Sequence, residues 1–342
     1  MRIDGRGAVA VGSALTAAVL WALDVALWQP LAERPGDFAF VYAENNTYWA
    51  RDLRFCAVVA IALAICLAGR GAGLSRWVAP VTAAGWIGVD LAVDRAGLEG
   101  DAVATVLAVV GGLAAVAVPT VVLRRVGDGR PRRRPLVLGA SIAASLAPLA
   151  AGMESPTDTE AALTPAAAIL GVLFTVLALA LAWTAAPDRS RARLVAAGVI
   201  VAGAAVTLLL SRVLAPGTRL TPMMLLGALL LAGVALVTGD LPRAPLPWLQ
   251  QLPKLLVLLV VYPALVLFAL LLTAYVVPVA SWFTALSGNV PVNAADSDTL
   301  YALVGVLAGG TIGWFLLVVD RAFVVPPADA KPSMEEVTTA SR

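Results

Sequence analysis

Residues 255–277 read LLVLLVVYPALVLFALLLTAYVV, a stretch that contains no charged side chain. A helix of about 20 mostly apolar residues is long enough to cross the hydrocarbon core of a bilayer. Lipid offers no hydrogen-bond partner to the backbone, so a segment that crosses it satisfies its own N–H and C=O groups by forming a helix. The stretch therefore predicts a transmembrane helix.

Similar apolar stretches recur along the chain, and they decide the fold class. We predict an all-α, polytopic integral membrane helix bundle of about ten transmembrane helices over residues 1–323, followed by a disordered cytoplasmic tail over residues 324–342. The predicted spans lie near 8–28, 53–69, 77–94, 102–123, 135–152, 162–186, 193–214, 220–239, 255–277 and 301–320.

The composition of the whole chain agrees with this class. Hydrophobic residues make up 60% and charged residues 13% of the 342 residues, whereas soluble domains are about half apolar and about a quarter charged. A chain of this composition has too few polar residues to cover a water-soluble core. Soluble enzymes, secreted disulfide scaffolds and disordered proteins are therefore excluded.

The sequence also lacks the residues of common catalytic sites. It contains no histidine, which excludes Ser-His-Asp and Cys-His catalysis as well as histidine-ligated zinc. Neither a phosphate-binding Walker A loop nor a G-x-S-x-G nucleophile turn occurs in the chain. We therefore expect a protein that is not an enzyme and that holds no cofactor and no metal ion.

The basic residues predict the orientation, because Lys and Arg concentrate in the cytoplasmic connections of membrane proteins. If the N-terminus is cytoplasmic, all but six of the 24 basic residues fall on the inner side. The six on the outer side are Arg34, Arg51, Arg54, Arg95, Arg212 and Arg219. An even number of spans then places both termini in the cytoplasm. The abundance of Ala, Val, Gly, Pro and Arg indicates a bacterial genome, and hence a multi-pass protein of the bacterial cytoplasmic membrane.

Three connections are candidates for contacts outside the bundle. The inner loop 124–134, RRVGDGRPRRR, is predicted to bind anionic lipid headgroups rather than nucleic acid. The outer loops 29–52 and 278–300 are long enough to act as lids or substrate contacts, or to pack as plugs over helix ends. Within the second of them, residues 279–286 are predicted to form a short interfacial helical turn.

Charged side chains inside the spans are the candidate functional residues, because an ionisable group in lipid is energetically costly. Asp24, Asp90 and Arg212 each lie about one helical turn before the outer end of a span, and Asp94 follows Asp90 by one turn. We predict that they converge in a binding site for a substrate or an ion. The alternative is a set of ion pairs that only ties helices together.

Small residues mark one face of the last span. Gly305, Gly309 and Gly313 repeat every four residues, a spacing that allows two helices to approach closely. The pattern predicts helix packing. It fits a contact inside the bundle and equally a contact with a partner protein or with a second copy of the chain.

Three functions are compatible with these features. The first is a small secondary transporter or permease with a polar site towards the outer side, since ten spans divide into two halves of opposite orientation, as in inverted-repeat transporters. The second is a non-catalytic membrane subunit or scaffold that docks a partner. The third is an outward-facing lipid-linked transferase whose carboxylates act as acid and base.

Overall fold

The structure, a computed structural model, describes residues 5–30, 39–127, 129–152, 163–186, 190–213, 220–239, 252–288 and 300–322. All regular elements in these ranges are helices. They are α1 (Gly5–Leu23), η1 (Asp24–Trp28), α3 (Ala39–Ala68), α4 (Gly73–Arg95), α5 (Asp101–Val126), α6 (Arg133–Gly152), α7 (Leu163–Ala185), α8 (Arg191–Val213), α9 (Leu220–Thr238), α10 (Leu252–Leu271), η4 (Leu272–Val276), α11 (Val279–Ser287) and α12 (Tyr301–Ala322). The labels η1 and η4 mark π-helical segments that continue α1 and α10.

Six helical segments in the described ranges are long and apolar enough to cross a membrane. They are Gly5–Trp28, Asp101–Val126, Arg133–Gly152, Pro165–Ala185, Leu256–Val276 and Tyr301–Val318. Shorter apolar stretches lie within α8 and α9. This architecture is that of a helical membrane protein.

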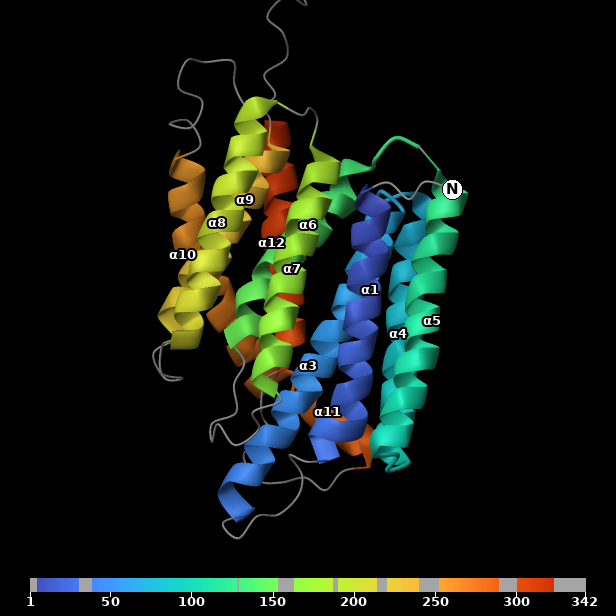
Figure 1. The fold of residues 1–342 in the computed structure, drawn as a ribbon. Helices are drawn as coiled ribbons and strands as arrows, with labels where there is room; N and C mark the ends of the chain where they lie inside the picture. The colour runs from blue at the N-terminus through green and yellow to red at the C-terminus, as the bar shows by residue number, and fades with distance from the viewer. Residues whose placement is uncertain are drawn as a thin grey trace, which may run out of the picture.

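The helix α6 lies at the centre of the bundle. It packs against α7, α12 and α9, and 78% of its apolar stretch is buried, against 28% for α5 and for α10 with η4. Figure 1 shows α1, α3, α4 and α5 on one side of the bundle and α8, α9 and α10 on the other. The helices α5 and α10 therefore present most of their apolar surface outward, where lipid lies in a membrane.

Each predicted span coincides with a long helix, but α3 differs from its prediction. The sequence predicted a short span at 53–69 after an outer loop at 29–52, whereas α3 already begins at Ala39. Residues 39–52 contain neither glycine nor proline, so their backbone does not interrupt a helix that the apolar part stabilises. The sequence analysis looked for apolar runs, and it missed this part of the helix because the segment also contains polar residues.

Other predicted segments have mixed outcomes. The expected short turn at 279–286 is the nine-residue helix α11. Residues 289–299 of the 278–300 loop and the predicted tail 324–342 lie outside the described residues.

Arginines at helix starts hold one end of the bundle together. Arg6 Nη1 donates a hydrogen bond of 3.0 Å to the carbonyl of Ala68, and Arg133 Nη2 donates one of 2.7 Å to the carbonyl of Thr238. Arg193 is buried and donates to carbonyls at the same end of α9. A guanidinium at the carboxyl end of a helix satisfies unpaired carbonyl groups and complements the helix dipole. These residues come from segments expected on the inner side, so we call this end the basic end.

The three glycines of the last span lie against α6. A Cβ atom at Gly309 would lie 2.5 Å from the carbonyl oxygen of Ser141 and 2.6 Å from Cα of Ile142. Gly305 and Gly313 would likewise place a Cβ within 3.0 Å of atoms of α6. This face of α12 therefore makes a contact within the chain. Association of the last span with a partner protein or a second copy stays a prediction.

Replacing Gly309 by leucine is expected to lower the free energy of unfolding by about 1–3 kcal/mol, the usual cost of overpacking. The added side chain meets the backbone of α6, which does not rotate away as a side chain would. The melting temperature in detergent measures the effect. Gly310→Leu is the control, because nothing lies within 4 Å of a Cβ at Gly310. An equal loss of stability in both variants would contradict the packing described here.

Candidate functional site

Three helical segments bring four ionisable side chains together towards the end of the bundle opposite to the basic end. Asp24 begins η1, Arg54 lies in α3, and Asp90 and Asp94 lie one turn apart on α4. All are almost fully buried: Asp24 is 1% exposed, and the side chains of Arg54, Asp90 and Asp94 are 1%, 2% and 8% exposed. We call these four residues the Arg54 cluster.

Arg54 bridges the two carboxylates of α4. Its Nη2 donates a hydrogen bond of 3.1 Å to Asp94 Oδ2, and its Nε lies 3.5 Å from Asp90 Oδ1. The first helix adds a neutral donor to each carboxylate. Trp21 Nε1 donates to Asp90 Oδ1 at 2.7 Å, and Gln29 Nε2 donates to Asp94 Oδ1 at 2.9 Å. Hydrogen bonds to ionised groups are among the strongest in proteins, so α1, α3 and α4 are held together at this point.

Asp24 is less well paired than the other two carboxylates. Its Oδ1 is buried and has no hydrogen-bond partner among the described residues. The carboxylate interacts electrostatically with the guanidinium of Arg54 and with Asp90. It also lies on a π-helical turn, a feature that is frequent at functional sites. Three carboxylates thus share the guanidinium of Arg54, and Arg51 adds a weaker attraction for Asp90. Full ionisation would leave the three carboxylates in excess over these two guanidinium groups.

Hydrogen bonds from two arginines hold the short helix α11 beside the Arg54 cluster. Arg51 Nη1 donates to Thr284 Oγ1 at 2.7 Å and to the carbonyl of Ala280 at 3.2 Å. Arg95 Nη1 donates to the carbonyl of Leu286 at 3.0 Å. Figure 1 shows α11 at the same end of the bundle as the lower ends of α1 and α4. This part of the 278–300 segment therefore packs over helix ends.

The structure brings Asp24, Asp90 and Asp94 together around Arg54, a cation that the sequence analysis did not assign to this site. The side chain of Arg212 lies outside the described residues. Its helix, α8, packs against α9, α7 and α6, on the side of the bundle away from α1 and α4 (Figure 1). The sequence placed these charges at one depth, but depth alone does not tell which helices are neighbours.

The sequence analysis missed Arg54 because it counted this residue among the charges of the outer surface. A signal was present, since Arg54 lies inside the predicted span 53–69. Arg51 precedes it by three residues, a spacing that places both on one face of a helix. Trp21 and Gln29 gave no such signal, because a tryptophan in an apolar span and a glutamine at its edge are also typical of packing and of membrane interfaces.

The arrangement limits the chemistry of the site. Among the described residues, no three Cys, His, Asp or Glu side chains are placed to hold a metal ion together. The cluster offers carboxylates that accept a proton or a small cation, and a guanidinium that responds to their charge. The same four residues are equally able to act as a buried ion-pair network. Removing one partner from such a network strongly destabilises a protein.

Comparison with known proteins gives no match, whether with protein-family models, with curated proteins or with solved structures. The function is therefore argued from the fold and from the Arg54 cluster.

Proposed function

We propose that the protein is a small secondary transporter of a bacterial cell membrane in which the Arg54 cluster binds the coupling proton. The observation that carries this proposal is the unequal charge of the cluster, in which three carboxylates surround the buried guanidinium of Arg54, with Arg51 as a second cation that interacts more weakly with Asp90. Like charges in a site of low dielectric disfavour full ionisation. Asp24 is the least paired of the three, so we assign the transported proton to Asp24.

Arg54 is suited to couple this proton to a movement of helices. It pairs with α4 through Asp90 and Asp94, while its Nη1 is buried without a hydrogen-bond partner among the described residues. When Asp24 loses its proton, the guanidinium attracts a third carboxylate. The balance of attraction between α1, α3 and α4 then changes, and a bundle with two packing arrangements shifts towards the one that suits the new charge.

The proposal includes ten transmembrane helices with both termini in the cytoplasm. The gathering of the expected inner segments at the basic end supports this topology. Single cysteines introduced into 124–134 or at the C-terminus should be shielded from membrane-impermeant reagents in intact cells, and cysteines at exposed positions of 29–52 or 278–300, such as Leu286, should react. The background is a chain in which Cys56 and Cys66 are replaced by alanine. Labelling of the 124–134 loop from outside would reverse the orientation.

Transport is tested in proteoliposomes that carry a pH gradient and an internal pH-sensitive dye. Panels of amino acids, sugars, organic acids, organic cations and inorganic ions are added one class at a time. We expect one class to dissipate the gradient with the wild-type protein and to leave it intact with Asp24→Asn, which keeps the shape of the side chain but does not ionise. Gly310→Leu serves as the control for an unrelated substitution. A solute response that is unchanged in Asp24→Asn would remove Asp24 from the mechanism.

A membrane subunit or scaffold is the second candidate, and the close burial of the cluster under α11 favours it. In that case the cluster only fixes helices, and a variant that loses all four charges should fold and still support the function of the cell. The lipid-linked transferase requires carboxylates that face an opening, whereas the cluster side chains are at most 8% exposed.

A further inference from the structure

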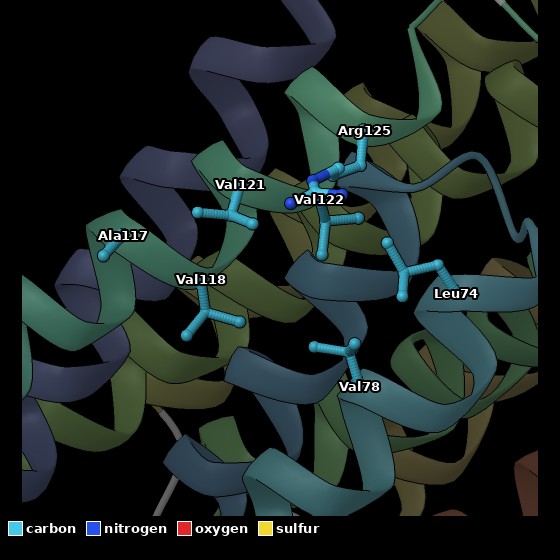
Figure 2. Close-up of a pocket in the computed structure, with 7 residues that line it drawn as sticks. All are labelled: Leu74, Val78, Ala117, Val118, Val121, Val122 and Arg125. Atoms are coloured by element: carbon cyan, nitrogen blue, oxygen red, sulfur yellow. The ribbon is translucent and has the colours of Figure 1, made fainter.

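An apolar groove runs between α4 and α5 near the basic end. It has a volume of about 420 Å³ and is lined by Leu74 and Val78 from α4 and by Val118 and Val121 from α5. Figure 2 shows these side chains on the two sides of the groove, with Arg125 at one end. Its lining residues on α5 run from Ala117 to Arg125, eight residue steps that correspond to about 12 Å along the helix axis.

The packing of α3 explains why the two helices stand apart at this place. Gly69, just after α3, approaches both of them. A Cβ atom on Gly69 would lie 2.5 Å from Cβ of Ser75 in α4 and 2.9 Å from Cγ1 of Val122 in α5. Further from the basic end the gap is closed, because Trp86 of α4 lies within 3.3 Å of a Cβ built on Gly111 of α5. The groove is therefore a fixed feature of the fold with one closed end.

Arg125 gives the open end of the groove a positive charge. Its side chain is exposed, and it forms no hydrogen bond or ion pair with another described residue. Trp77 of α4 is 72% exposed at the same level of the bundle. Exposed tryptophans of membrane proteins gather at the interface between hydrocarbon and headgroups. Arg125 therefore lies at the depth where lipid phosphates lie.

We propose that this groove binds one anionic phospholipid, whose headgroup phosphate contacts Arg125 and whose acyl chain lies along the valines of α5. The hydrocarbon matches the apolar lining, and a phosphate matches a guanidinium that has no partner in the described chain. A second copy of the protein or an apolar partner helix would cover the valines but would leave the charge of Arg125 unpaired. The charge of the groove thus favours a lipid as its occupant.

Native mass spectrometry of the full-length, delipidated protein tests this proposal. The probes are phosphatidylglycerol and phosphatidylcholine with identical acyl chains. We expect one phosphatidylglycerol molecule to bind in preference to phosphatidylcholine. Arg125→Gln should weaken phosphatidylglycerol binding about fivefold, the effect of about 1 kcal/mol that one basic residue contributes near a membrane surface. Arg124→Gln removes the same charge from the neighbouring position outside the groove and should have a smaller effect.

A second pair of variants tests the apolar part of the site. Val121→Trp fills the groove and should weaken the binding of both lipids. Val109→Trp is the matched control, since Val109 lies on the same helix, outside the groove, and is 57% exposed against 53% for Val121.

Three results would overturn the proposal. Equal losses for Arg125→Gln and Arg124→Gln would show diffuse attraction rather than a site. Unchanged lipid binding by Val121→Trp would place the acyl chain elsewhere. A dimer of the wild-type protein that dissociates in Val121→Trp would identify the groove as an interface between two copies.

Discussion

Replacing Arg54 by methionine is expected to lower the free energy of unfolding by about 3–5 kcal/mol, the usual cost of breaking a buried ion pair from one side. The substitution removes the guanidinium that lies 3.5 Å from Asp90 and 3.1 Å from Asp94. Both carboxylates then stay buried without their cation. Methionine is chosen because it is long, unbranched and apolar, so that it fills the space without a new charge. Denaturant-induced unfolding in detergent micelles measures the loss.

The matched control is the triple variant Arg54→Met, Asp90→Asn, Asp94→Asn. It removes the charges of Arg54, Asp90 and Asp94 together, and the asparagine oxygens still accept the hydrogen bonds from Trp21 and Gln29. We expect this variant to be more stable than Arg54→Met alone, because Asp24 is then the one carboxylate of the cluster left without its guanidinium, whereas Arg54→Met leaves three. If the single and the triple variant unfold at the same denaturant concentration, the three side chains do not act as one energetic unit.

Replacing Trp21 by alanine is expected to cost about 3–5 kcal/mol, the usual range for truncating a buried tryptophan. Trp21 is 2% exposed and meets Trp86 in a T-shaped contact with 5.5 Å between ring centroids. Its indole also donates to Asp90. Trp21→Phe keeps a six-membered ring in this place but loses the hydrogen bond and part of the indole packing, so we expect a smaller loss than for Trp21→Ala, about 1.5–3 kcal/mol, the size of a hydrogen bond to a charged group.

Thermal and denaturant unfolding of the two Trp21 variants measure these losses. A loss in Trp21→Phe as large as in Trp21→Ala would show that the six-membered ring kept in Trp21→Phe does not stabilise the protein at this position. Wild-type stability of Trp21→Phe would show that Asp90 does not depend on its indole donor.

The helical membrane bundle was predictable because it follows from composition and from the length of apolar runs. The convergence of the acidic residues was predictable in part. Asp24 and Asp90 lie at similar depth within spans, and Asp94 lies one turn from Asp90. These facts depend only on distances along single helices, which a sequence contains directly.

The partner of these carboxylates was not predictable in the same way. Arg54 and Arg212 both lie near the outer ends of predicted spans, and the choice between them depends on which helix packs beside α4. That choice arises from contacts such as those of α3 with α1 and α4, which are made by small apolar side chains common to every span. The sequence pattern therefore does not show which of these apolar helix faces pack against each other.

The π-helical turn η1 sets the directions in which Trp21 and Gln29 point from the helix. Trp21 and Gln29 are eight residues apart, so in a regular α-helix, at about 100° per residue, they would point about 80° apart. The π turn takes up about one additional residue, which brings the two side chains to within about 20° of each other and lets both reach carboxylates of α4. Deleting a single residue such as Val25 would restore a regular helix with Trp21 and Gln29 seven residues apart, and the two side chains would still point within about 20° of each other. Inserting a residue would instead turn Gln29 by about 100° relative to Trp21, so this turn should accept a one-residue deletion far better than a one-residue insertion.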